Sequence, residues 1–556
     1  MIVVLVLIVL ILSLYLYSGY RAIGKRQALT EDINEAWAKP LDNYRDINLI
    51  ASYHHYLKTE SAVSDSIAAD IDLESVFYYA DRTSSKIGQQ CLYHQLRSPE
   101  TDAENLQKLD QLTEQLTADE ETRTAIQLEL SRLNHKNAYY LHELFNGRHI
   151  PFYSALLIQY IRFAWFLWIV TLVLTIITHA QLLFLLALGL TLFNFYLHYS
   201  NKKNILSYVH SLPQLYVLIQ VAKNMTQRVE FAGNEAIPQH LQKLNSLKRS
   251  LRFVNFEDRV ASNDPTDLIY AFWELFKTTL LIEPAMFIAS IDKVAAGRED
   301  IEALFKYIGQ IDMAISVQSF RLSLPYYSKP DFISDYHTLS VTDLYHPLVE
   351  HCVPNSLVTL DSQGVLVTGS NMSGKTTFIR AMAVNALLSQ TLFTSCTRKY
   401  QAPFVQLFTS IRINDDMEEH KSYFQAEALS VLNIMTQSKS RPVKSLVIID
   451  EIFRGTNTIE RVAGAKAILS YFTANQSFVF VSTHDLELAE LLGTEYAVYC
   501  FEEKVADTRL VFDYKIKPGI LKHKNAIAIM AGLGYPESVI ADAYAMSEQL
   551  REKYKL

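Results

Sequence analysis

Two parts of the chain are almost continuously apolar, whereas the rest mixes polar and apolar positions. Residues 2–17 are interrupted only by Ser13 and are followed by a basic cluster between Arg21 and Arg26. A signal peptide carries its positive charge before the apolar run, so the reversed order here predicts an uncleaved membrane anchor over residues 1–20. Its apolar length of about 16–20 residues is just enough to span a bilayer. A buried helix is the alternative.

The second apolar part covers residues 152–199 and breaks near His179 and Gln181. The break leaves two arms that are each about as long as a membrane-spanning helix. Trp165 and Trp168 lie near the start of the first arm, where aromatic side chains favour the membrane interface. This pattern predicts a transmembrane hairpin over residues 151–200, with a buried helical pair as the alternative.

Basic residues flank these apolar segments on one side only. Arg148 precedes the hairpin, Lys202 and Lys203 follow it, and the Arg21–Arg26 cluster follows the N-terminal segment. Positive charge favours the cytoplasmic side of a membrane. The pattern therefore predicts an integral protein of an inner or plasma membrane, with its N-terminus outside and the soluble segments on both sides of the hairpin in the cytoplasm.

The soluble segments differ in their periodicity. Apolar residues recur at spacings of three and four in stretches such as 106–116 and 301–322, which predicts helices. From Leu344 onward, short apolar strands alternate with helices, as in an α/β domain with a mainly parallel sheet. We therefore predict a multidomain α and α/β protein in which the α/β domain begins between Pro325 and His337.

Composition places only a few limits on the domain number and on the possible ligands. A chain of 556 residues is too long for one hydrophobic core. The formal net charge of −8 gives no overall basic field, so any nucleic acid would have to meet a local patch. The four cysteines form no CxxC pair, which indicates reduced thiols and offers no zinc site.

A glycine-rich loop supplies the strongest chemical signal. The short apolar run 365–367 leads directly into residues 369–376, which read G-x-x-x-x-G-K-T, and a periodic helical segment follows. Such a loop points backbone N–H groups at phosphate oxygens at a helix N-terminus. In this pattern Lys375 reaches the β- and γ-phosphates of ATP and Thr376 ligates Mg²⁺. The predicted nucleotide contacts are Gly369, Ser370, Asn371, Met372, Ser373, Gly374, Lys375, Thr376 and Thr377.

An acidic pair follows a second apolar strand. Residues 446–449 run into Asp450 and Glu451, which is the arrangement a phosphate-loop ATPase needs opposite its loop. We expect Asp450 to hold Mg²⁺, directly or through water. Glu451 is the better candidate to polarise the attacking water, because in-line attack needs a base beyond the metal ligand.

A third apolar strand, residues 478–481, leads to His484. This position falls at the carboxyl end of the sheet, where α/β folds bind their ligands. We predict that His484 senses the γ-phosphate and belongs to the catalytic group with Glu451 and Lys375. A structural histidine is the alternative.

The motifs together resemble the MutS family of DNA mismatch repair ATPases. Residues 368–380 are similar to the family's nucleotide loop, including its Asn-Met, and residues 450–458 resemble its DEIGRGTST segment with Phe453 and Asn457 as departures. Further similarities lie at 414–417 (ADDL), 422–427 (STFM-x-E), 346–350 (RHP-V-E), 81–88 and 96–99 (start of the helical core) and 526–536 (helical dimerisation element).

The resemblance implies a dimer whose nucleotide sites are shared between subunits. In that family the element at Ser422 completes the partner's site, so Ser422 is expected near the partner's γ-phosphate; a helix N-cap is its alternative role. We expect no counterpart of the family's mismatch-reading domain, since only the segment before about residue 76 precedes the core-like motifs. The expected protein is a membrane-anchored MutS-like ATPase without an evident mismatch reader.

Three partners or roles remain open at this point. Basic residues outnumber acidic ones between Lys202 and Arg259, which suits DNA phosphates and anionic lipid equally well. An ABC-type transport ATPase would share the loop, the acidic pair and the histidine, but the sequence has no LSGGQ-like segment. A nucleotide-switched membrane scaffold without hydrolysis fits poorly with the intact Lys375, Thr376, Asp450 and Glu451.

The predicted organisation has six parts. They are a transmembrane anchor (1–20), a helical linker with the first part of the core (21–150), the transmembrane hairpin (151–200), a helical lever and core region (201–335), the phosphate-loop ATPase domain (336–515) and a C-terminal helical dimerisation element (516–556).

Overall fold

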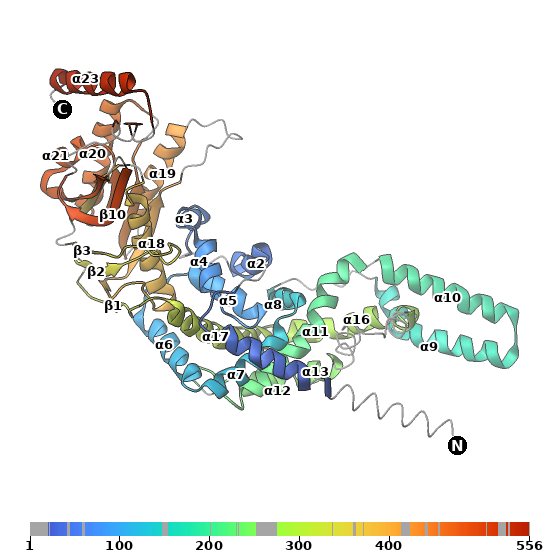
Figure 1. Cartoon of the computed structure of the whole chain (residues 1–556). Coiled ribbons are helices and arrows are strands. Elements are labelled where there is room, and N and C mark those ends of the chain that lie inside the picture. The colour runs from blue at the N-terminus through green and yellow to red at the C-terminus, as the bar shows by residue number, and fades with distance from the viewer. Residues whose placement is uncertain are drawn as a thin grey trace. The chain divides into compact units, whose positions relative to one another are not determined.

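The computed structural model of the chain is shown in Figure 1. It describes residues 20–21, 23–41, 45–57, 62–146, 154–200, 202–229, 231, 233–251, 275–335, 337–359, 363–370, 372–412, 423–439, 443–453, 456–506, 509–520, 527, 530–531 and 534–554. The chain divides into two compact units. The first comprises Met1–Lys58, Asp81–His94 and Gln111–Ser319, and the second comprises Thr59–Ala80, Gln95–Asp110 and Phe320–Leu556.

The described part of the first unit is helical. Its helices, three of which continue into the second unit, are α2 (Ile47–Leu57), α5 (Lys86–Arg97), α6 (Ala103–Thr117), α7 (Glu120–Leu130), η1 (Ser131–Leu133), η2 (Lys136–Tyr140), α8 (Leu141–Asn146), α9 (Ala155–Thr178), α10 (Gln181–Ser200), α11 (Lys202–Met225), α12 (Ile237–Lys243), α13 (Asn245–Leu251), α16 (Ile282–Ala296) and α17 (Arg298–Ser323).

Helix α5 packs closely against α17 because Gly88 of α5 leaves room for the buried Asp312 carboxylate of α17. The Asp312 carboxylate of α17 accepts hydrogen bonds from the backbone N–H groups of Ser84 and Ser85, each at 2.8 Å, and so caps the start of α5. A Cβ atom on Gly88 would lie 2.1 Å from the Asp312 carboxylate. Only glycine fits there, which explains part of the 81–88 motif.

Helices α9 and α10 lie side by side as the predicted hairpin (Figure 1). Among the described residues, Leu156–Thr178 and Gln181–Ser200 are the two helices long and apolar enough to cross a membrane. The first ends at His179, which takes the left-handed conformation (φ 52°) and donates its backbone N–H to Thr175. Both helices leave most of their side chains exposed. Residues 1–19, which hold almost all of the other predicted anchor, lie outside the described residues.

The root of the hairpin packs into the first unit. Ile161 and Leu197, one from each arm, are buried in a cluster with Leu281 and Ile288 of the α16 region. The buried Asn194 accepts a hydrogen bond from the Tyr160 hydroxyl at 2.6 Å and donates one to the Thr279 carbonyl at 2.7 Å. Most of the exposed apolar side chains of the hairpin lie beyond this root, although Leu156, Phe163 and Tyr196 are exposed beside it.

Two sheets organise the second unit. The larger has the order β10-β9-β4-β8-β7-β6, in which β9, β4, β8, β7 and β6 are parallel and the edge strand β10 is antiparallel. The smaller, β1-β5-β2-β3, pairs β2 antiparallel with both β5 and β3. The strands are β1 (Asp331–Phe332), β2 (Leu339–Leu344), β3 (Asn355–Thr359), β4 (Gly364–Gly369), β5 (Lys399–Ala402), β6 (Val405–Ser410), β7 (Lys444–Asp450), β8 (Phe478–Thr483), β9 (Tyr496–Ala506) and β10 (Arg509–Pro518).

The prediction of a mainly parallel sheet therefore holds for the larger sheet only. The smaller sheet is mixed because β2 is antiparallel to both neighbours, while β1 is parallel to β5. Its strands come from segments on both sides of the phosphate loop, and sequence periodicity carries no information about such pairing. The remaining described helices are α3 (Asp65–Asp70), α4 (Leu73–Ala80), α18 (Lys375–Leu392), α19 (Tyr423–Ser438), α20 (Thr458–Ala474), α21 (Glu487–Leu492), the short η3 (Gly493–Glu495) and α23 (Glu537–Tyr554).

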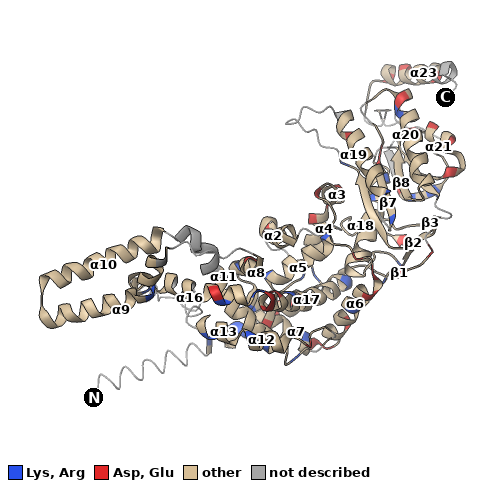
Figure 2. Ribbon diagram, turned by 180° about the vertical axis from the view of Figure 1, so that it is seen from behind, with Lys and Arg blue, Asp and Glu red and all other residues tan. Residues whose placement is uncertain are grey.

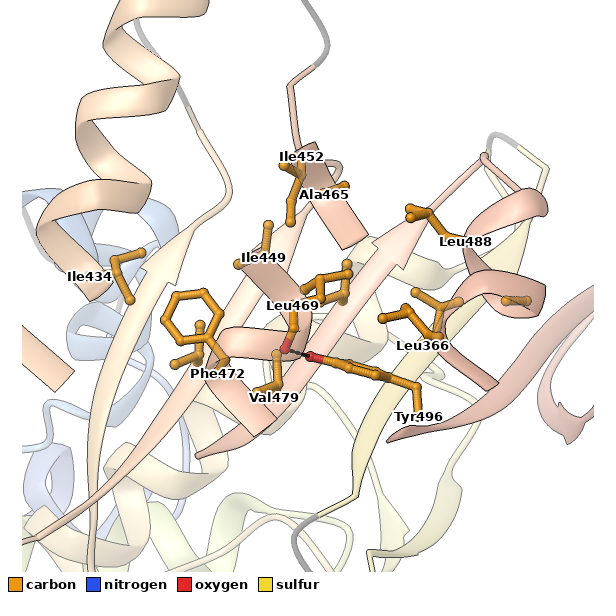
Figure 3. Close-up of a cluster of buried hydrophobic side chains, with 14 of the residues drawn as sticks. Leu366, Ile434, Ile449, Ile452, Ala465, Leu469, Phe472, Val479, Leu488 and Tyr496 are labelled. Carbon is orange, nitrogen blue, oxygen red and sulfur yellow. Dashed lines mark hydrogen bonds between the residues drawn. The ribbon is translucent and has the colours of Figure 1, made fainter. Parts of the chain in front are cut away.

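The larger sheet is stabilised by an apolar core against α20 and α21 (Figure 3). Leu469 and Phe472 of α20 are fully buried with Val479 of β8. The Tyr496 hydroxyl donates a hydrogen bond to the Leu469 carbonyl at 3.0 Å. The Tyr496 ring lies so close to Gly364 that a Cβ atom there would be 2.1 Å from it. This packing holds β9 and α20 against the start of β4, the strand that leads into the phosphate loop.

Candidate nucleotide site

The phosphate loop joins β4 to α18 and depends on its two glycines. Gly369 (φ 149°) and Gly374 (φ 107°) both adopt backbone conformations that side chains disfavour. A Cβ atom on Gly369 would lie 2.8 Å from Ser373 Oγ, and one on Gly374 would lie 3.3 Å from the Tyr514 ring. The loop thus turns the chain sharply into the N-terminus of an 18-residue helix, whose N–H groups and dipole favour an anion.

Lys375 is the first residue of α18, and its side chain folds back over the loop. Its ammonium group donates hydrogen bonds to the carbonyls of Gly369 at 3.0 Å and Ser370 at 2.7 Å. Its Nζ also lies 3.5 Å from Nε2 of His484. The cation predicted to meet the phosphates is therefore held at the mouth of the loop beside the predicted histidine.

The two predicted magnesium ligands contact each other directly. Thr376 Oγ1 donates a hydrogen bond to Asp450 Oδ2 at 3.0 Å. The other carboxylate oxygen of Asp450 accepts a hydrogen bond from the Ser482 hydroxyl of β8. A hydroxyl and a carboxylate beside a phosphate loop are the oxygen ligands that Mg²⁺ takes in such sites, so this donor set fits the metal.

Glu451 and His484 form the second pair. Their side chains meet at 2.9 Å between Oε1 and Nε2. Glu451 follows the end of β7 in a left-handed conformation (φ 59°), and its backbone N–H donates to the Ser482 carbonyl at 3.0 Å. A non-glycine residue held in this region stores strain and is over-represented at functional sites. The turn after β7 therefore directs the Glu451 carboxylate toward His484.

The loop after His484 is tied to α20. Arg461 binds the Asp485 carboxylate through two hydrogen bonds of 2.9 and 2.7 Å. This bidentate pair fixes the residue next to His484. Neither Arg461 nor Ser482 was predicted from the sequence, because nothing in their local pattern distinguishes them from ordinary helix and strand residues.

A cavity of about 590 Å³ opens beside the loop. This volume lies in the range of small-molecule sites. Its predicted lining residues are Met372, Ser373, Gly374, Lys375, Thr376, Thr377, Asp450 and Glu451. Gly369, Ser370 and His484 do not line the cavity but contact its lining through Lys375 and Glu451. Asn371 and Ser422 lie outside the described residues.

The cavity lining also includes His346, from the 346–350 motif, and two aromatic residues, Phe501 and Tyr514, that were not predicted from the sequence. Burial lowers the pKa of His346 to about 4, and this neutral imidazole lies in the lining with Tyr514 and Phe501. Asn355 fixes Tyr514 at a bulge of β10: its amide donates to the Tyr514 carbonyl at 3.0 Å and accepts from the Ile516 N–H at 2.8 Å. The result is an aromatic ring above Gly374.

We expect Tyr514→Ala to weaken ATP binding by about three- to tenfold, because it removes an aromatic face from the cavity wall. Binding of a fluorescent ATP analogue measures this change. Tyr56→Ala is a matched control, since Tyr56 is also about half exposed (47%) but lies far along the chain on α2. Equal loss in both variants would contradict a specific role for Tyr514.

The two departures from the resembled motif have different physical consequences. Asn457 caps α20 by accepting a hydrogen bond from the Glu460 N–H at 3.0 Å, so it does the same work as the serine it replaces. Phe453 stands where the motif has glycine and keeps the glycine-like conformation (φ 62°). Its ring packs against Phe424 of α19, with centroids 5.3 Å apart, and its N–H donates to the buried Glu427.

The fold and the site define a phosphate-loop nucleotide-binding domain with an acidic pair opposite its loop. Residues 365–551 match the family model MutS domain V, which is an ATPase domain. The chain is 32% identical over 291 residues to the DNA mismatch repair protein MutS of Staphylococcus carnosus, covering 49% of this chain and 32% of that one. It is 26% identical over 346 residues to MutS protein homolog 4 of Mus musculus, covering 59% and 34%. It is 30% identical over 268 residues to the MutS protein of Petrotoga mobilis, covering 46% and 32%.

Residues 365–551 are therefore a domain of the MutS domain V type, and the chain is similar to MutS proteins over about half of its length. The matched region spans about a third of the length of each of these relatives.

Proposed function

We propose that this protein is a MutS-type ATPase that binds and hydrolyses Mg-ATP. The observation that carries the proposal is the convergence of two side-chain pairs, Thr376 with Asp450 and Glu451 with His484, on the loop that holds Lys375. A loop that only binds phosphate needs its backbone N–H groups and the lysine. Hydrolysis further needs a carboxylate for Mg²⁺ and a group that orients the attacking water, and the acidic pair supplies both.

Each of these groups has a distinct task. Lys375 balances the charge of the β- and γ-phosphates, and Thr376 and Asp450 would hold Mg²⁺, which would supply charge neutralisation for the ADP leaving group. Glu451 accepts a hydrogen bond from the attacking water and draws off its proton. His484, already 2.9 Å from Glu451 and 3.5 Å from Lys375 Nζ, is placed to hydrogen-bond the γ-phosphate side of the site.

The proposal is tested by ATPase assay of the full chain purified in detergent. Magnesium-dependent phosphate release supports it, and nucleotide binding without release would favour the scaffold alternative. The same assay with duplex, mismatched and branched DNA tests a second candidate role, DNA binding. Basic residues of the helical unit favour that role; among them are Lys223, Arg228, Lys243, Lys248 and Arg249. Figure 2 shows Lys and Arg of the chain in blue. The similarity to a DNA mismatch repair protein favours the same role.

We further propose that the active form is a homodimer with shared nucleotide sites. The support is the family resemblance of Ser422 and the packing of α19 on the turn after β7 through Phe424 and Phe453. If Ser422 acts on the partner's nucleotide, Ser422→Ala and Lys375→Ala should each inactivate the protein alone. Mixing the two inactive chains should restore ATPase activity, because a mixed dimer contains one complete site. No recovery after subunit exchange would contradict the shared site.

The membrane role belongs to the same proposal. The exposed apolar side chains of α9 and α10 would cost free energy in water and are stabilised in lipid. The charge pattern supports an ATPase domain in the cytoplasm, where ATP is found, and an N-terminus outside. Residues 1–20 would add a further anchor. The match of residues 365–551 to MutS domain V supports a MutS-type ATPase over the ABC-type alternative.

A further inference from the structure

Three segments of the second unit contribute a group of paired charges close to the site. The group consists of Asp72, Arg380 and Arg412. Arg380 lies on α18 four residues after Thr376, so both side chains lie on one face of the helix. Its Nη1 atom forms an ion pair with Asp72 Oδ2 at 3.1 Å. Arg412, just after β6, binds the same carboxylate at 2.7 and 2.9 Å.

Asp72 is held rigidly in this position. It lies between α3 and α4 in a left-handed conformation (φ 53°). Two residues earlier, the buried Asp70 carboxylate accepts hydrogen bonds from Thr409 Oγ1 at 2.6 Å, Ile411 N at 3.1 Å and Arg412 N at 2.8 Å. The α3–α4 junction is thus pinned to the end of β6, and Asp72 presents its charge to Arg380 at a fixed place.

The charge of Arg380 is coupled to those of its acidic and basic neighbours. Burial lowers the pKa of Arg380, while Asp72 and Asp450 raise it and Arg412 lowers it further. Arg380 is therefore within electrostatic reach of the Asp450 carboxylate, and its side chain is only 18% exposed, so solvent screens the interaction weakly. A guanidinium released from Asp72 would be free to pair with Asp450 instead.

We propose that Asp72 is a positioning residue for the magnesium site: it keeps Arg380 engaged and offsets part of its charge, which leaves the Asp450 carboxylate available to Mg²⁺. The inference rests on the proposed function, because it takes Thr376 and Asp450 as the magnesium ligands. It assigns to an N-terminal segment, remote in sequence from the ATPase motifs, a direct effect on metal affinity.

The test is the Mg²⁺ dependence of nucleotide binding in the full chain, measured with a fluorescent ATP analogue at controlled free Mg²⁺. Asp72→Asn removes the charge but tolerates the left-handed backbone. We expect the half-saturating Mg²⁺ concentration to rise about three- to tenfold, the effect of one partly screened unit charge at short range. Binding measured without Mg²⁺ should not weaken. Asp72→Glu should restore most of the affinity.

Two controls separate this electrostatic role from a structural one. Asp65→Asn on α3 removes another carboxylate with an arginine partner, Arg97 at 2.6 Å, and should leave the Mg²⁺ dependence unchanged. In an Arg380→Gln background, Asp72→Asn should have little further effect, because the two act through one interaction.

Three results would overturn the inference. A normal Mg²⁺ midpoint in Asp72→Asn, with the parent chain binding nucleotide in a Mg²⁺-dependent way, would remove it and leave the ATPase proposal intact. A parallel fall in binding with and without Mg²⁺, together with a lower melting temperature, would show that Asp72 only stabilises the fold. Absence of nucleotide binding by the parent chain would overturn the inference and the proposed function together.

Discussion

Replacing Glu451 with Gln is expected to lower ATP turnover by about 100- to 1,000-fold, the usual contribution of a general base. ATP binding should stay within about twofold of the parent chain, because the phosphate loop and the Thr376–Asp450 pair are untouched. Gln keeps the size of the side chain and can still face His484, so the loss reports the missing base rather than a lost fold. Phosphate release and equilibrium binding on one preparation measure both quantities.

Lys375→Ala is the complementary variant. It removes the buried ammonium group that lies against Gly369 and Ser370, and with it the charge compensation of the phosphates. We expect ATP binding to weaken by roughly 10- to 100-fold, as for the loss of charge-assisted hydrogen bonds. Full hydrolysis by Glu451→Gln would show that another group is the base.

The second large expected effect is the release of the protein from the membrane when its apolar segments are removed. Removing residues 1–20 should leave the protein in the membrane, because the hairpin alone supplies two arms of about the spanning length. Replacing residues 166–192 as well with a short Gly-Ser loop should release a soluble ATPase. This design removes most of the exposed apolar side chains of α9 and α10 but keeps the root residues Ile161, Asn194 and Leu197, which pack into the helical unit.

Fractionation after carbonate and high-salt washes measures this outcome. ATP binding by the released protein shows that it is folded. If carbonate or salt removes the intact chain from membranes, the protein is not integral, and the apolar faces of α9 and α10 are covered by protein instead.

The parts of the site that sequence could predict are those whose chemistry is local. The loop, the acidic pair and the histidine each follow directly on a buried strand, and parallel strands bring their carboxyl ends to one edge. The contacts between Thr376 and Asp450 and between Glu451 and His484 follow from that rule. The helical hairpin was predictable from an equally local signal, because the break in the apolar run coincides with the end of α9 at Thr178.

The parts that could not be predicted depend on segments that meet only in the folded chain. Tyr514 reaches the cavity because Asn355, distant in sequence, holds a bulge of β10. Asp72 reaches Arg380 because Asp70 is hydrogen-bonded to the end of β6. An antiparallel edge strand and a mixed second sheet likewise arise from pairing, which apolar periodicity does not specify.

Phe453 shows how a motif departure becomes interpretable only in three dimensions. Its left-handed conformation is one that glycine adopts freely, and a side chain there costs about 1 kcal/mol. The contact of its ring with Phe424 and the packing of the ring on Gly464 offset part of that cost. The turn after the acidic pair is thereby linked to α19, the helix that follows Ser422.

The most direct test of the central claim is single-turnover phosphate release by the detergent-purified chain, with excess protein over Mg-ATP, run beside Glu451→Gln. We expect the parent chain to convert the bound ATP to ADP and phosphate, while Glu451→Gln retains it as ATP. Retention of intact ATP by the parent chain, at full binding and with Mg²⁺ present, would contradict the claim that this protein is an ATPase.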